Sequence, residues 1–136
     1  MFYFLWFCLG VVLAMPLLIL AERVKLNLMT HLMGASLVFA AIIYLGFALV
    51  WGDTYWLLIE FSGVVAYGIF YLLAVRFSAI WLSVGWLLHP IWDVVLHLNG
   101  PGSHVAPEWY AVACLSFDIA VAAYIFKRLR NETETA

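Results

Sequence analysis

The chain has 136 residues, of which 68% are apolar and 10% are charged, and its mean hydropathy is +1.07. A soluble domain is nearer half apolar and a quarter charged, so this composition predicts an integral membrane protein with no separate soluble domain. The net charge of −2 argues against a nucleic-acid partner. Both cysteines lie inside apolar runs, and we therefore expect no disulfide framework.

Apolar segments of membrane-spanning length follow one another along the chain. The first, residues 2–21, has no charged residue and is too long for a typical signal peptide, so we expect it to be retained as a helix. Polar turns or breaks separate the other spans, which we place at residues 28–51, 55–75, 77–98 and 107–126. The whole chain, residues 1–136, is predicted to be one all-α membrane domain, a bundle of five transmembrane helices.

Every lysine and arginine falls on one side of this predicted bundle. They lie in the turn after the first span, in the break between the third and fourth spans, and after the fifth span: Arg23, Lys25, Arg76, Lys127, Arg128 and Arg130. Cytoplasmic segments of membrane proteins are enriched in basic residues. We therefore expect the N-terminus outside the cell and the C-terminus in the cytoplasm.

The fourth span carries His89, Asp93 and His97 at intervals of four residues. On a helix these side chains lie near one face and drift by about 40° per step. Pro90 cannot donate a hydrogen bond to the carbonyl of Trp86, so we expect a kink there. Ionisable side chains inside a bilayer are costly and are usually functional, and this pattern therefore predicts a site.

The predicted topology assigns a depth to each polar side chain. His97 lies near the outer surface, Asp93 roughly 7 Å deep and His89 roughly 13 Å deep. Glu60 in the third span lies about 8 Å deep, and Asp118 in the fifth lies about 16 Å deep. Because these side chains share the outer half of the membrane or its midplane, we expect them to surround one polar pocket.

Two kinds of active site fit these residues, and a structural role remains the alternative. In one, His89, Asp93 and Asp118 bind a divalent metal ion, while Glu60, His97 and Asp118 are the candidate catalytic acids and bases. In the other, no metal ion binds and the carboxylates transfer protons, as in an isomerase. In the structural alternative, Asp93 only satisfies the N–H groups of its neighbouring histidines.

Further residues are expected to frame the pocket. Trp86 and Trp92 lie to either side of the polar file, the row formed by His89, Asp93 and His97, and are predicted to form aromatic walls. His97, together with His104 and Glu108 from the region after the fourth span, is expected at the mouth of the pocket on the outer side.

The polar pattern of residues 86–118 can be compared with that of known families. It comprises His89-x-x-Trp92-Asp93, a histidine at 97, then Pro107-x-Trp109-Tyr110, Cys114 and Asp118. This pattern resembles a family of small bacterial integral membrane proteins of unknown function. The family has adjacent histidines where this chain has Leu96 and then a single histidine. The resemblance implies a multi-pass protein of the bacterial inner membrane and supplies no activity.

Three functions fit the sequence. The first, which we favour, is an intramembrane enzyme that acts on an apolar or lipid-like substrate. The second is a small transporter or a proton or metal-ion pathway, although no inverted repeat is visible and polar residues become sparse toward the cytoplasmic side. The third is an accessory subunit of a membrane complex. Expected partners are membrane lipids and an apolar small molecule, and a homo-oligomer remains open.

Overall fold

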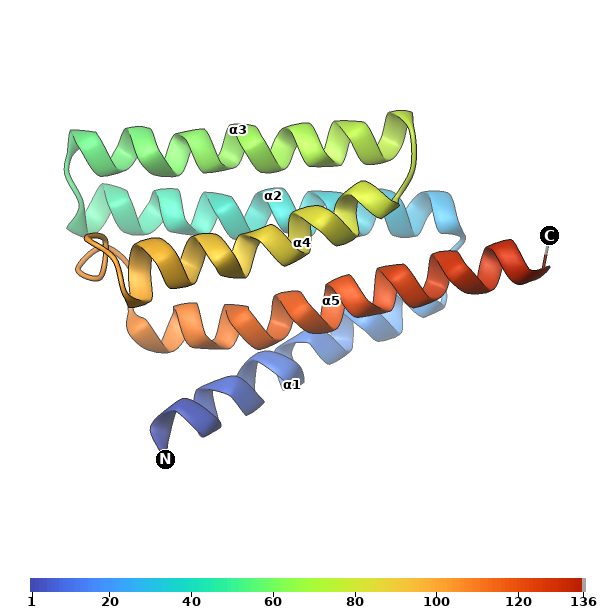
Figure 1. The fold of residues 1–136 in the computed structure, drawn as a ribbon, viewed down its shortest axis with the longest axis horizontal. Coiled ribbons are helices and arrows are strands. Elements are labelled where there is room, and N and C mark those ends of the chain that lie inside the picture. Colours follow the sequence, from blue (N-terminus) through green and yellow to red (C-terminus); the bar gives the residue numbers. More distant parts are fainter. Residues whose placement is uncertain (136) are drawn as a thin grey trace.

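In a computed structural model that describes residues 1–135, the chain folds into helices, and these residues contain no strand (Figure 1). The prediction of an all-α fold is therefore confirmed for the described residues. α1, α2, α3 and α5 are each long and apolar enough to cross a membrane. The elements are α1 (Phe2–Glu22), α2 (Leu26–Trp51), α3 (Thr54–Arg76), α4 (Ile80–Trp92), the π-helix η1 (Asp93–Leu98) and α5 (Glu108–Thr135).

The fourth predicted span is a continuous helical path that changes geometry at Asp93. α4 has 13 residues and η1 has 6, so the path reaches a length comparable to the other helices only when both are taken together. Pro90 has no N–H group and interrupts the α-helical hydrogen bonding. Beyond it the backbone widens, and the N–H of Asn99 bonds to the carbonyl of Val94, five residues back, at 3.0 Å. Turns of this π type occur mostly inside α-helices and are frequent at functional sites.

The fifth helix is longer than predicted, because it continues through the expected polar tail. Two ion pairs between side chains four residues apart stabilise this extension, Arg128–Glu132 at 3.3 Å and Arg130–Glu134 at 3.0 Å.

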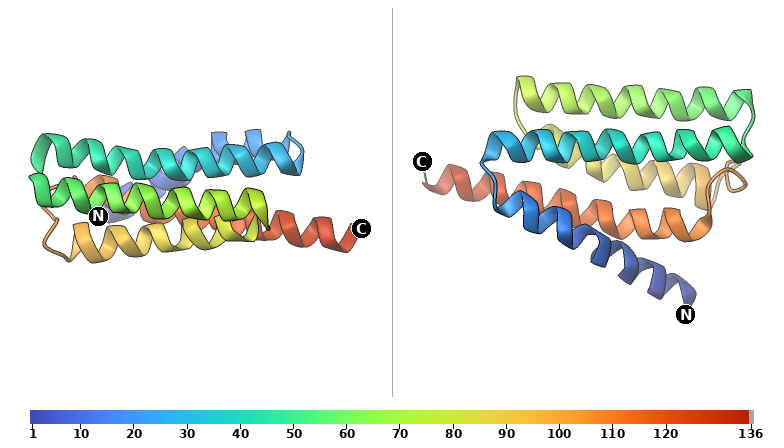
Figure 2. Two further views of the ribbon diagram at one scale, coloured as in Figure 1. Left: turned by 90° about the horizontal axis from the view of Figure 1, so that it is seen from above. Right: turned by 180° about the vertical axis from the view of Figure 1, so that it is seen from behind.

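Successive helices run in opposite directions, so the bundle has two distinct ends (Figures 1 and 2). One end carries the α1–α2 turn, the α3–α4 turn and the C-terminal part of α5, and the other carries the α2–α3 turn and the α4–α5 loop. We call the first the basic end, because it holds all six lysine and arginine residues, and the second the loop end. The charge sorting predicted from the sequence is therefore present in the fold.

α1 packs mainly along α5, the last helix of the chain, and makes little contact with α2. At Gly10, a Cβ atom would lie 1.9 Å from the carbonyl oxygen of Ala113, so only glycine permits this close approach. The hydroxyl of Ser116 donates a hydrogen bond to the carbonyl of Phe7 at 2.6 Å. Small residues thus bring the two backbones together, as they do in many membrane helix pairs.

Polar contacts also join α1 to α5 near both of its ends. Near the loop end, the hydroxyl of Tyr3 donates a hydrogen bond to the carboxylate of Glu108. Near the basic end, Arg128 lies 3.3 Å from a carboxylate oxygen of Glu22. α1 is therefore attached to α5 at three levels.

We expect Gly10→Ala to destabilise the bundle by about 1–3 kcal/mol, because the added methyl group forces α1 away from α5. Gly46→Ala is the matched control, since a Cβ at Gly46 meets nothing within 4 Å. The free energy of unfolding in mixed detergent micelles measures both. Equal stability of the two variants would contradict the close packing of α1 on α5.

The interior has an apolar core toward the basic end and a polar region between that core and the loop end. All five α-helices contribute side chains to the core. α2 and α5 meet through side chains nearer the loop end, where the ring of Tyr110 lies 5.4 Å from that of Tyr44. A smaller apolar group of Ala48, Trp56 and Val105 lies at the loop end. Fully buried members of the main core include Met29, Met33, Leu37, Leu82, Val121 and Ile125.

Candidate functional site

Five ionisable side chains meet in the polar region of the interior. They are Glu60 from α3, His89 from α4, Asp93 and His97 from η1, and Asp118 from α5, and none is more than 2% exposed. These are the residues that the sequence singled out as candidate catalytic or metal-binding groups. The structure divides them into two neighbouring groups with different partners.

His89, Asp93 and Asp118 form the first group. His89 Nδ1 lies 2.9 Å from Asp118 Oδ2 and 3.6 Å from Asp93 Oδ2. Each residue offers one ligand atom, and these atoms all lie within 4.8 Å of one another. The three side chains could therefore hold a metal ion, as the sequence predicted.

Hydrogen bonding in this group is incomplete. His89 Nδ1 is hydrogen-bonded to Asp118, and Asp93 accepts no hydrogen bond at either of its carboxylate oxygens. His89 Nε2 and Asp118 Oδ1 are also buried without a partner. A buried carboxylate without donors or a counter-ion costs several kcal/mol, and every lysine and arginine of the chain lies toward the basic end.

Glu60 and His97 form the second group, together with Trp92. His97 Nε2 lies 3.2 Å from Glu60 Oε1, although neither atom has hydrogen-bond geometry in this arrangement. The indole N–H of Trp92 donates to the other carboxylate oxygen of Glu60 at 3.3 Å. On its opposite side, His97 Nδ1 lies 3.1 Å from the carbonyl oxygen of Gly102.

The carbonyl of Gly102 fixes the proton arrangement of this pair. A carbonyl oxygen can only accept, so Nδ1 of His97 carries a proton. The close approach of His97 Nε2 to Glu60 is then favourable only when a second proton lies between them, on the imidazole or on the carboxyl group. The two side chains are therefore close enough to exchange one proton once they adopt hydrogen-bond geometry, as an acid–base pair does.

Tyr44 of α2 joins the two groups and was not predicted from the sequence. Its ring lies 4.7 Å from that of His97 and 5.7 Å from that of His89, and its buried hydroxyl lies near Asp93 without hydrogen-bond geometry. Tyr67 of α3 lies 5.0 Å from the ring of His89. Tyr44 is seven residues from the end of its helix, about 10 Å along the axis, so the depth argument used for the acids could have found it.

His89, Asp93 and His97, which were predicted to lie near one face of the fourth span, are all buried. They do not all contact the same partners. Asp93 faces His89 and Asp118, whereas His97 faces Glu60 on α3. A π-turn contains more residues than an α-turn. Four residues after Asp93, the chain has therefore not completed a full turn, and His97 points in a different direction from Asp93. η1 thereby directs His97 away from the metal-ligand group.

The residues expected at a mouth on the loop end are divided: His104 and Glu108 line a surface hollow of about 240 Å³, but His97 does not. His97 is 1% exposed and lies inside the bundle, while His104 and Glu108 are on the surface. The α4–α5 loop folds back over η1, and the buried side chains of Trp56 and Val105 pack at this end. A turn-rich loop predicted as an opening is instead a cover, so the polar region is closed toward the loop end.

Two of the hollows on the surface of the bundle adjoin the buried cluster. The first, which we call the α1–α2–α5 cleft, has a volume of about 410 Å³ and is mostly apolar. Trp86, Cys114 and Asp118 are among the residues that line it, so it reaches the metal-ligand group. The ring of Trp86 lies 6.5 Å from that of His89, in agreement with its predicted place beside the polar file.

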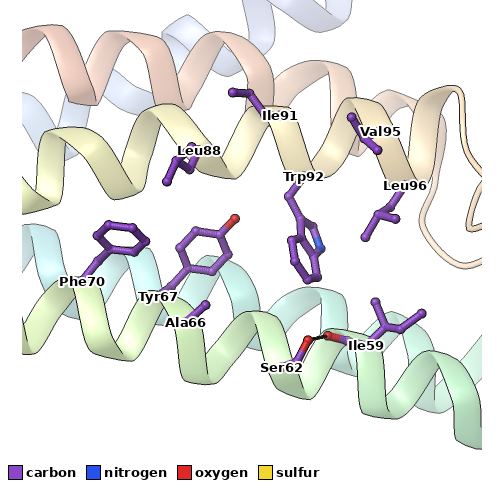
Figure 3. A pocket seen from close by; sticks show the side chains of 10 residues that line it. All are labelled: Ile59, Ser62, Ala66, Tyr67, Phe70, Leu88, Ile91, Trp92, Val95 and Leu96. Atoms are coloured by element: carbon purple, nitrogen blue, oxygen red, sulfur yellow. Dashed lines mark hydrogen bonds between the residues drawn. The ribbon is translucent and has the colours of Figure 1, made fainter.

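The second hollow, the α3–α4 groove, lies between those two helices and has a volume of about 590 Å³ (Figure 3). Tyr67 from α3 and Trp92 from α4 extend across it from opposite sides, with ring centroids 6.4 Å apart. These two side chains also contact His89 and Glu60, respectively. They therefore form a wall between the groove and the buried cluster.

Comparison with known proteins gives one match. The model of a protein family described as a family of unknown function (DUF6010) matches residues 6–131. No curated protein and no solved structure matches the chain. The match covers all the residues of the buried cluster and agrees with the resemblance to an uncharacterised family.

Proposed function

The chain belongs to DUF6010, a family of unknown function, and we propose that it is an intramembrane enzyme acting on an apolar or lipid-like substrate. In this proposal, His89, Asp93 and Asp118 bind a divalent metal ion. The protein crosses the inner membrane of a bacterial cell five times, and α4 with η1 forms the fourth crossing. The basic end lies in the cytoplasm, in keeping with the positive-inside rule.

The main support for the metal site is the environment of the Asp93 carboxylate. Its side chain is fully buried, and neither carboxylate oxygen accepts a hydrogen bond. A divalent cation between Asp93, Asp118 and His89 would neutralise the two carboxylates, and at His89 Nδ1 it would replace the proton that now bonds this atom to Asp118. Histidine with carboxylates favours a first-row transition metal such as Mn²⁺ or Zn²⁺ over Ca²⁺, which prefers oxygen ligands alone.

Three protein ligands leave coordination positions free, as catalytic metal sites do. The metal would supply Lewis-acid chemistry, and the proton shared by Glu60 and His97 would supply acid–base chemistry beside it. Tyr44, which contacts both histidines, links the two parts of the site.

The surroundings of the cluster favour an enzyme over an ion pathway. Toward the basic end, the described interior is filled by apolar side chains such as Met33, Leu37 and Leu82. Toward the loop end, it is covered by the α4–α5 loop. An ion pathway needs polar groups along its length, whereas here the α1–α2–α5 cleft reaches the cluster from the side.

Metal binding by the purified full-length protein tests this proposal. After removal of metal with a chelator, we expect the protein in detergent to take up about one Mn²⁺ or Zn²⁺ per chain by elemental analysis. We expect Asp118→Asn to weaken binding by more than about tenfold. Asp53→Asn is the matched control, because Asp53 is exposed and caps α3 outside the cluster.

Two results would contradict the proposal. One is a failure of the wild-type protein to bind either ion at millimolar concentration. The other is a metal-ion flux across proteoliposomes that Asp118→Asn abolishes, which would instead indicate a pathway for ions.

A further inference from the structure

The α1–α2–α5 cleft gives the buried cluster an apolar access route. Its volume of about 410 Å³ is within the range that holds one small-molecule ligand. Of the five ionisable residues of the cluster, Asp118 is the one that lines this cleft. A ligand in the cleft would therefore have a largely apolar body and would meet Asp118 with its polar part.

Two residues in the cleft lining have buried polar atoms without a partner. Asp118 Oδ1 is an acceptor, and its second oxygen is already occupied by His89. Trp86 Nε1 is a donor. Both residues adjoin His89, since Asp118 is hydrogen-bonded to it and the ring of Trp86 lies 6.5 Å from the imidazole. Two residues of the cleft lining that adjoin the same imidazole thus have, respectively, one unpaired acceptor and one unpaired donor.

The α3–α4 groove is larger, but its lining residues include none of the five ionisable residues of the cluster. Ser62 donates its hydroxyl to the carbonyl of Ile59, and Trp92 donates its indole N–H to Glu60. The polar hydrogens of both side chains are therefore already used within the protein.

A hydroxyl group complements the pair in the cleft, because it can donate one hydrogen bond and accept another. It would donate to Asp118 and accept from Trp86. An ammonium group could not accept from the indole, an ether could not donate to the carboxylate, and a carboxylate would be repelled by the acidic cluster.

We propose that the α1–α2–α5 cleft binds a long-chain apolar alcohol, with its hydroxyl held between Trp86 and Asp118 and its apolar body lying along α1, α2 and α5. This inference rests on the proposed function and names the class of its substrate.

Photolabelling of the full-length protein in detergent tests the inference. The probe is hexadecanol that carries a diazirine in its chain, and labelled residues are mapped by mass spectrometry. We expect labelling of cleft residues such as Phe39 and Phe117. Unlabelled hexadecanol should compete at least about tenfold better than its methyl ether, because the ether leaves the Asp118 carboxylate unpaired. Equal competition by the alcohol and the ether would overturn the inference.

Matched tryptophan substitutions locate the site. Ala40 lines the α1–α2–α5 cleft and Ala66 lines the α3–α4 groove, and both are half-buried. We expect Ala40→Trp to abolish the labelling that hexadecanol displaces and Ala66→Trp to leave it unchanged. Trp86→Phe keeps an aromatic ring but removes the donor, so it should reduce the preference for alcohol over ether. The opposite pattern for the two alanine variants would place the ligand in the other hollow.

The test of metal binding and the test of alcohol binding can give a negative result independently of each other. Alcohol-selective labelling of the cleft in a protein that binds no divalent ion would leave the ligand site standing and contradict the metal enzyme. A protein that binds the ion but shows no alcohol-selective labelling would contradict the ligand class alone.

Discussion

Asp93→Asn is expected to be more stable than the wild type without metal and less stable than the wild type with metal. In chelator, the variant should be more stable than the wild type by about 1–3 kcal/mol, because it removes a buried carboxylate that accepts no hydrogen bond. With Mn²⁺ at about a thousand times the dissociation constant, the wild type should gain about 4 kcal/mol. The variant should gain little, because it has lost a ligand.

Unfolding in mixed micelles, with and without the ion, measures all four states. Asp53→Asn makes the same chemical change at an exposed helix cap and should leave the metal response intact. If Asp93→Asn destabilises the protein equally in both conditions, Asp93 has a structural role and is not a metal ligand. A stability difference between variant and wild type that changes sign with metal therefore identifies Asp93 as a metal ligand. A difference that does not change sign supports the structural role that the sequence also allowed.

Glu60→Leu is expected to destabilise the protein by about 3–5 kcal/mol, because it leaves the imidazole of His97 and the indole N–H of Trp92 buried without their shared partner. Glu60→Gln should retain most of the stability, because the amide can still accept from Trp92 and can donate to His97. The free energy of unfolding measures both variants.

The same two variants separate folding from chemistry. Once a substrate is in hand, Glu60→Gln should lose turnover by about 10²–10⁴-fold while remaining folded, because an amide cannot exchange a proton with His97. Glu134→Leu is the control for stability, since Glu134 lies in an exposed ion pair and its loss should cost no more than about 1 kcal/mol. A folded Glu60→Gln protein with full turnover would exclude Glu60 as a catalytic group.

The meeting of Glu60, His89 and Asp118 could be predicted from the sequence. Their depths follow from the order of the spans and the rise per residue of a helix, and burial of a charge in an apolar bundle requires partners. The arrangement within the cluster could not be predicted in the same way. It depends on the π-turn after Pro90, which a regular helical periodicity does not contain, and this turn separates His97 from the metal-ligand group.

Long-range packing was also beyond the sequence pattern. Gly10 and Ser116 are far apart in the chain, and each is an ordinary small residue in an apolar segment until α1 and α5 are placed side by side. The closed loop end depends on His97 and Gly102, whose contact folds a turn-rich segment back over η1. Composition and periodicity describe single helices, whereas these features arise between them.

The pairing of α1 with α5 has a consequence for how the protein is made. In the proposed membrane topology, the first helix enters the bilayer long before its main partner exists, because α5 leaves the ribosome after α2, α3 and α4. During that interval α1 has only its limited contact with α2, and the wall of the cleft that it forms with α5 is missing. Membrane insertion of this chain can therefore precede completion of its cleft, and a nascent chain that stops before Glu108 presents the surface around Gly10 to lipid or to the insertion machinery.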